Sequence, residues 1–141
     1  MSQAPYEYTV RGQCLAGGTA ELHAGDQVVH MDARWGSEAP SSLPGPAELL
    51  ASAFAACLMK NLERSSILLG ITYRSARVEV RARRQDSPPI FVGVTYEMQV
   101  DSDASEHQLE VMHRNLKKFG TVYNTLAAVC EVRGTVQKAE V

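Results

Sequence analysis

A long apolar segment in the first half of the chain limits the available folds more than any other feature. From Pro46 to Gly70 the sequence begins with proline, ends on glycine and contains neither residue in between, a pattern typical of one α-helix. Between Leu49 and Met59 only Ser52 interrupts the apolar and small residues, so the first half of this helix is apolar nearly all round. Such a helix is buried on most faces. In a chain of 141 residues one sheet covers one face, so we expect a second subunit to cover the rest in a homodimer.

Alternating apolar and polar residues predict strands on both sides of this helix. Residues 6–10 alternate, and glycine pairs and turns divide residues 6–33 into what we interpret as a β-meander. After the helix, residues 76–83 and 92–100 alternate again, with a proline-containing turn at residues 86–89 between them. These two strands are expected to form an antiparallel hairpin with one buried and one solvated face.

A second helix is predicted after the hairpin. Asp103 or Ser105 can cap it, with Glu106 or Gln108 three residues further on. Its apolar residues follow helical spacing up to Gly120, at Leu109, Met112, Leu116 and Phe119. A short helical segment over about residues 123–129 and a final strand carrying Val132 and Val136 complete the chain. The fold class is therefore α+β, and the length predicts one domain over residues 1–141, since domains cluster near ~100–150 residues.

The composition narrows the function classes. Hydrophobic residues make up 45% and charged residues 21%, as in an ordinary globular protein, and the net charge is −2. We therefore expect no nucleic-acid partner and no membrane association, and a cytoplasmic protein. The three cysteines lack metal-ligand spacing, so they are expected to be free thiols, with no metal and no organic cofactor.

Two motifs and the order of elements resemble the OsmC/Ohr hydroperoxide-reductase superfamily over almost the whole chain. The first is the Pro46-Ala47-Glu48-Leu49-Leu50 helix start followed by Ala55-Ala56-Cys57, and the second is Val122-Tyr123-Asn124-Thr125-Leu126 after the second helix. The resemblance implies an OsmC-like fold with an N-terminal β-meander, a long buried central helix, a β-hairpin, a second helix and a C-terminal strand. It also implies an intertwined homodimer with two equivalent sites at the interface.

In the peroxidase members of this superfamily a helix thiolate attacks an organic hydroperoxide and becomes a sulfenic acid. A second cysteine after the late helix resolves it, while an arginine and a glutamate hold the thiolate. Cys57 matches the nucleophile, but Gly120 stands where the resolving cysteine is expected and Thr19 stands where the arginine is expected. Ala47 occupies the glutamate position of Ohr proteins, whereas Glu48 fits the broader OsmC-like branch. The chain thus resembles an OsmC-like protein outside the Ohr group.

Cys57 itself has two interpretations. In a run of alanines on a buried helix, a cysteine is typically a small packed hydrophobe. As a nucleophile it needs help to form the thiolate, because mid-helix it gains little from the helix dipole. The cation would come from Lys60 one turn on, from Arg34 on the preceding loop, or from the partner subunit; Lys60 can equally be a solvated surface residue.

The remaining candidates also have two interpretations each. Cys130 either resolves Cys57 or packs at the start of the last strand, and Cys14 is a weaker resolver still. Glu48 either orients a partner of Cys57 or complements the helix dipole, since nine residues place the two on nearly opposite sides of an ideal helix. His30 and Asp32 form a surface pair or a catalytic pair, and Tyr123 lines the pocket or packs in the core.

The leading hypothesis is an OsmC-like redox protein that weakly reduces organic hydroperoxides or hydrogen peroxide. Cys57 and Glu48 are its catalytic residues, and an external thiol is its reductant. The alternative hypothesis is a noncatalytic OsmC-like protein that binds a small apolar ligand at the dimer interface, with Cys57 lining the pocket. In a third interpretation the cysteine only fills the core and the fold serves some protein partner.

Overall fold

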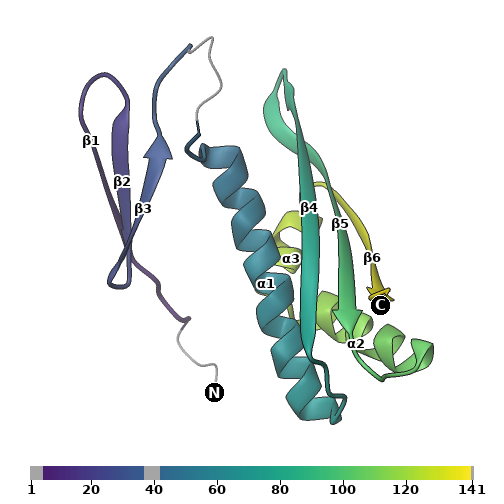
Figure 1. The fold of residues 1–141 in the computed structure, drawn as a ribbon. Helices are drawn as coiled ribbons and strands as arrows, with labels where there is room; N and C mark the ends of the chain where they lie inside the picture. Colours follow the sequence, from purple (N-terminus) through teal and green to yellow (C-terminus); the bar gives the residue numbers. More distant parts are fainter. Residues whose placement is uncertain (1–4, 37–41, 141) are drawn as a thin grey trace. The chain divides into compact units, whose positions relative to one another are not determined.

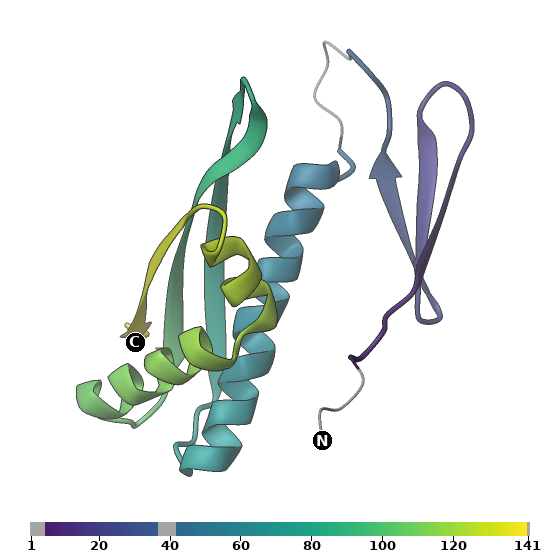
Figure 2. The same ribbon diagram turned by 180° about the vertical axis from the view of Figure 1, so that it is seen from behind.

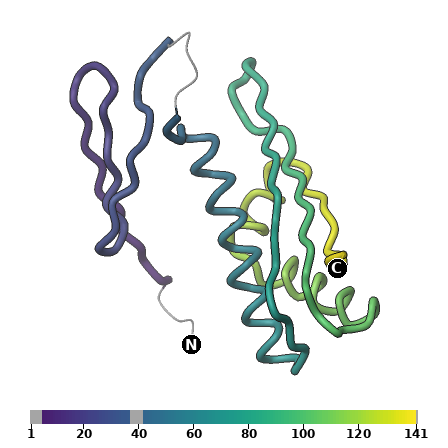
Figure 3. The backbone as a smooth tube through the Cα atoms, viewed as in Figure 1, coloured from purple at the N-terminus to yellow at the C-terminus, as the bar shows by residue number. Residues whose placement is uncertain are grey.

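The structure, a computed structural model, describes residues 5–36 and 42–140 and divides the chain into two units, residues 1–49 and 50–141. Figure 3 traces the backbone through both units. Each unit is described by itself below. The single domain expected over residues 1–141 stays a prediction.

The first unit is the predicted β-meander. Strands β1 (Val10–Cys14), β2 (Thr19–Ala24) and β3 (Gln27–Asp32) pair antiparallel in the order β1-β2-β3 (Figure 1). Gly17 and Gly18 turn the chain between β1 and β2 with φ angles of 104° and 107°, a region that glycine enters without strain. The expected strand start at residues 6–10 is wrong: β1 begins only at Val10, whose partner Ala24 is the last residue of β2.

Helix α1 (Pro46–Leu69) has the predicted bounds. Gly45 accepts the first helical hydrogen bond from Leu49 N–H at 3.0 Å, and Gly70 ends the helix at a φ of 67°. Four residues along one stripe are fully buried, namely Phe54, Leu58, Leu62 and Ser65. Within one chain the helix thus buries one stripe, and all-round burial is not reached.

The second unit contains a sheet of order β4-β5-β6 (Figure 1). Strands β4 (Ser75–Asp86) and β5 (Pro89–Asp101) form the predicted antiparallel hairpin, and β6 (Glu131–Lys138) runs parallel to β5. Val92 was expected on the buried face but is 39% exposed, because Arg83 pairs with Gly93 and Arg84 pairs with Phe91. The unpaired Val92 is a β-bulge that shifts the alternation at this end of β5.

Helices α2 (Glu106–Phe119) and α3 (Thr121–Ala127) connect β5 to β6 and lie over the sheet, as Figure 2 shows from behind. Ser105 caps α2 in a complete capping box with Gln108, as predicted, whereas α3 begins two residues earlier than expected. The helices meet the sheet in a core whose β5 residues are Val94, Tyr96, Met98 and Val100. The α+β fold class is confirmed. No helix in the described part of the chain is long and apolar enough to span a membrane.

Candidate functional site around Cys57

Cys57 lies at the middle of α1, half-buried, with its sulfur against the junction of α2 and α3. A β-carbon added to Gly120 would lie 3.2 Å from Cys57 Sγ, so the two residues are in direct contact. Gly120 is held in the backbone of both helices: its N–H donates to Leu116 O at 3.1 Å, and its carbonyl accepts from Asn124 N–H at 2.9 Å. The residue expected from the resemblance to carry the resolving thiol therefore faces Cys57 and has no side chain.

Asn61 follows Cys57 by one helical turn and contacts it twice. Its Nδ2 donates to the Cys57 carbonyl at 2.9 Å and lies 3.6 Å from Cys57 Sγ. Residues four apart share a helix face, so the sequence places these side chains together once α1 is recognised. Sequence reasoning missed Asn61; a polar amide one turn after the cysteine, in an alanine-rich helix, was the available signal.

An aromatic cluster lies beside this site. The ring of Phe54 stacks on that of Tyr123 with centroids 5.8 Å apart, and Tyr96 lies 5.6 Å from Phe54 and 6.1 Å from Tyr123. Tyr123 is buried in the core, as one of its two interpretations expects, and it also borders Gly120; a role in lining a pocket stays a prediction. These rings pack together beside the turn of α1 that carries Cys57.

A hydrogen bond between two titratable groups extends the cluster to helix α2. Tyr96 Oη and His113 Nε2 are hydrogen bonded at 2.6 Å. Burial lowers the pKa of His113 to about 4, and burial also raises the pKa of Tyr96 above its ordinary value. The pair is therefore uncharged near neutral pH, which suits a hydrogen bond that is partly shielded from solvent.

The described contacts of the second unit include none between Cys57 and Lys60, the cation expected one turn further on. Lys60 is exposed, as a solvated surface lysine would be. Arg34 lies in the first unit, where its Nε bonds Asp32 at 3.1 Å and its side chain lies over Gly18, whose added β-carbon would overlap it. Support of Cys57 by Arg34 stays a prediction.

The other two cysteines are free thiols. Cys130 follows α3, and its Sγ donates to Leu126 O at 3.4 Å. Its backbone N–H also donates to Leu126 O at 2.9 Å, which holds Cys130 at the carboxyl end of α3, whereas Gly120, which faces Cys57, precedes that helix. Cys14 is exposed on β1 in the first unit. This arrangement favours a packed Cys130 over a resolving one.

Glu48 has a defined structural contact. Its Oε1 accepts a 2.7 Å hydrogen bond from Gly45 N–H, which is the return half of a capping box at the start of α1. A catalytic role for Glu48 stays a prediction. His30 and Asp32 lie on β3 with cross-strand partners Glu21 and Thr19, and Asp32 bonds Arg34.

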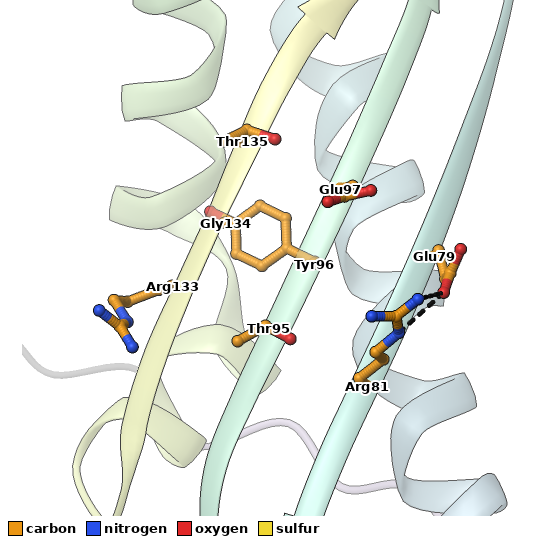
Figure 4. A pocket seen from close by; sticks show the side chains of 8 residues that line it. All are labelled: Glu79, Arg81, Thr95, Tyr96, Glu97, Arg133, Gly134 and Thr135. Carbon is orange, nitrogen blue, oxygen red and sulfur yellow. Dashed lines mark hydrogen bonds and ion pairs between the residues drawn. The ribbon is translucent and has the colours of Figure 1, made fainter.

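A surface hollow of about 310 Å³ lies elsewhere, over the sheet of the second unit (Figure 4). Three of its charged side chains form ion pairs: Arg81 bonds Glu79 at 2.7 Å, and Arg133 bonds Glu131. Cys57 is not among its lining residues. Among the described residues no three His, Cys, Asp or Glu side chains are grouped to hold a metal ion.

Solved structures with a similar fold include OsmC and Ohr proteins. An OsmC-like protein from Mycoplasma pneumoniae matches with a TM-score of 0.86 and 17% identity, over 96% of this chain and 100% of that one. An organic hydroperoxide resistance protein OsmC from Legionella pneumophila matches with a TM-score of 0.74 and 14% identity, over 96% and 100% of the two chains. OhrB of Bacillus subtilis, an organic hydroperoxide resistance protein, matches with a TM-score of 0.69 and 18% identity, over 92% and 98%.

These identities establish the fold alone. No curated protein matches the chain significantly. The family model described as "OsmC-like protein" matches residues 39–133, more than half of the chain, including the whole of α1 and the α2–α3 junction. The chain therefore belongs to the OsmC-like protein family.

Proposed function

We propose that the protein is a weak thiol-dependent peroxidase that uses Cys57 as its nucleophile and an external thiol as its reductant. The observation that carries the proposal is the contact between Cys57 Sγ and Gly120. The half-buried Cys57 sulfur contacts the position from which a second cysteine is expected to resolve it, and that position is glycine. A solved structure with a similar fold is an organic hydroperoxide resistance protein, which supports peroxide as the substrate.

The reaction is balanced without a cofactor. The Cys57 thiolate attacks one peroxide oxygen, the O–O bond breaks, the alcohol leaves with a proton, and the sulfur becomes a sulfenic acid. A first external thiol attacks that sulfur and releases water, forming a mixed disulfide. A second external thiol then attacks the mixed disulfide, restores the Cys57 thiol and leaves as the oxidised disulfide.

The absence of a side chain at Gly120 supports the external route, because it removes the internal resolving thiol from the residue that contacts Cys57 Sγ. Cys130, whose thiol already donates to Leu126 O, is poorly placed to take over this role.

A test of the proposal is peroxide consumption. Purified protein is mixed with cumene hydroperoxide and excess dithiol and compared with Cys57→Ser. We expect thiol-dependent peroxide loss that disappears in Cys57→Ser. Equal loss in both proteins, or no loss in either, would refute the proposal. No turnover together with a copurified apolar molecule would support the alternative, a noncatalytic ligand-binding protein.

Glu48 is proposed as a second catalytic residue, and its helix-capping contact allows a clean test. Glu48→Gln keeps an oxygen that can accept from Gly45 N–H, so the free energy of unfolding should change little. If the carboxylate acts in catalysis, peroxide turnover falls while stability is kept. Unchanged turnover in Glu48→Gln would assign Glu48 to helix capping alone.

We also propose that the protein acts as a homodimer. Large apolar side chains of α1 are exposed in the single chain, with exposed fractions of 46% for Met59, 71% for Ile67 and 63% for Leu68. Exposed apolar surface of this kind on a helix is typical of an interface. Sedimentation equilibrium at micromolar concentration should give the mass of two chains; the mass of one chain would contradict the proposal.

A further inference from the structure

Asn61 is placed to hydrogen bond the Cys57 sulfur. An asparagine amide carries two N–H donors, and one is used on the Cys57 carbonyl at 2.9 Å. The carbonyl contact fixes the amide orientation, because a carbonyl oxygen needs a donor and would repel Oδ1. The same nitrogen lies 3.6 Å from Cys57 Sγ, within reach of a hydrogen bond to sulfur.

The three cysteines differ in the sense of their hydrogen bonds. Cys57 accepts from Asn61, whereas the Cys130 thiol donates to Leu126 O and uses its proton to do so. Cys14 is exposed and has no described bond to its sulfur. A hydrogen bond that a sulfur accepts stabilises the negative charge of its thiolate. A thiol that donates a hydrogen bond loses that bond when it ionises.

The stripe that begins with Cys57 and Asn61 continues along the same face of α1. Arg64, the next residue in this i, i+4, i+7 series, lies with its guanidinium carbon 4.3 Å from the centroid of the Phe119 ring. Phe119 directly precedes Gly120, so the cation–π contact ties this face of α1 to the α2–α3 junction beside the sulfur.

Asparagine has no advantage in the middle of a helix, where alanine, leucine or glutamine is preferred. Helix propensity therefore does not explain an asparagine next to the sulfur, whereas its N–H donors can. We propose that Asn61 stabilises the thiolate of Cys57 by donating a hydrogen bond to Sγ. The inference rests on the proposed thiol chemistry of Cys57.

The test measures the reactivity of each cysteine without peroxide. Iodoacetamide reacts with the thiolate, so its rate at each cysteine, followed by peptide mass spectrometry from pH 5 to 9, reports how readily the thiolate forms. In Asn61→Ala we expect the Cys57 rate at pH 7 to fall about three- to tenfold, less than for a short charge-assisted bond, because the N···S distance is long. The rate–pH profile should move to higher pH. Asn61→Asp should slow Cys57 further, since it replaces the donor by a negative charge.

Asn115 provides a matched control. It also lies inside a helix, half-buried, and its Nδ2 donates to the carbonyl four residues earlier, Val111 O, at 3.3 Å. Asn115→Ala should leave the Cys57 rate unchanged, and Cys14 and Cys130 serve as references within each sample. Asn61→Ser, which keeps a side-chain bond to the helix carbonyl but shortens the donor, should behave like Asn61→Ala.

The inference would be overturned if Asn61→Ala and Asn61→Ser alkylate at Cys57 with the wild-type rate and profile. It would also be overturned if all three cysteines change together, which indicates general loosening of the fold. Failure of the proposed function looks different: Cys57 then keeps its dependence on Asn61, but peroxide is not consumed.

Discussion

Gly120→Cys is the substitution that most sharply tests the geometry around Cys57. Gly120 has φ −76° and ψ 110°, which any residue can adopt, and its added β-carbon lies 3.2 Å from Cys57 Sγ. In a disulfide with an S–S bond of about 2.04 Å, each β-carbon is about 3 Å from the opposite sulfur. We therefore expect the introduced thiol to form a disulfide with Cys57 on oxidation.

The stability change has two parts of opposite sign. In the reduced variant the new β-carbon lies 2.7 Å from Leu116 O and 3.0 Å from Tyr123 Cβ, and relief of this overlap should cost about 1–3 kcal/mol of unfolding free energy. In the oxidised variant the disulfide closes a loop of roughly 60 residues, for which the chain-entropy relation gives about 4 kcal/mol. The oxidised variant should therefore be about 1–3 kcal/mol more stable than the wild type.

Urea denaturation with and without dithiothreitol measures both parts, and intact mass with peptide mapping identifies the linked cysteines. Thr121→Cys is the control, since Thr121 is exposed one residue further on and should stay unlinked to Cys57. If the thiol in Gly120→Cys stays free under oxidation, or pairs with Cys130, the position of Gly120 against Cys57 is refuted.

Three further predictions concern stability and assembly. Gly134→Ala should lower the unfolding free energy by about 3 kcal/mol, since the new β-carbon would lie 2.4 Å from ring and carbonyl atoms of Tyr96. In the same urea titration the neighbouring control Thr135→Ala should change the unfolding free energy by less than about 0.5 kcal/mol. His113 has a folded-state pKa of about 4, below its ordinary value, so the unfolded chain binds more protons and stability should fall as the pH drops from about 6.5 to 4. His113→Gln should flatten this dependence when urea titrations at pH 4 and 7 are compared; an equal slope in both proteins would contradict it. Ile67→Asp should shift a dimer toward monomer in sedimentation equilibrium, and an unchanged mass would exclude Ile67 from the interface.

The sequence was sufficient to predict the elements whose signals are local. The bounds of α1 follow from Pro46 and Gly70, and the start of α2 follows from the Ser105–Gln108 capping box. The bulge at Val92 was not predictable, because it depends on how β5 pairs with β4 rather than on the residues of β5 alone. Phe119 fits the apolar spacing of α2 but is 43% exposed, since it packs against Arg64 instead of the core.

The sequence was sufficient to predict the candidate nucleophile, Cys57, but not the residues that contact its sulfur. The resemblance pointed to Cys57 and to position 120, but direct contact between residues so far apart in sequence needs the three-dimensional structure. Asn61 was within reach of sequence reasoning through helical spacing, yet its meaning depends on the sulfur distance. The apolar side chains that α1 exposes in the single chain agree with the second subunit that the sequence led us to expect.

The central claim is that Cys57 is the thiol that reacts with peroxide. It is tested most directly by adding less than one equivalent of cumene hydroperoxide to the reduced protein in the presence of dimedone, which traps sulfenic acids, and mapping the adduct by mass spectrometry. The account predicts an adduct on Cys57 ahead of the more exposed Cys14. Labelling of Cys14 first, or labelling of Cys57 no faster than Cys130, would contradict it.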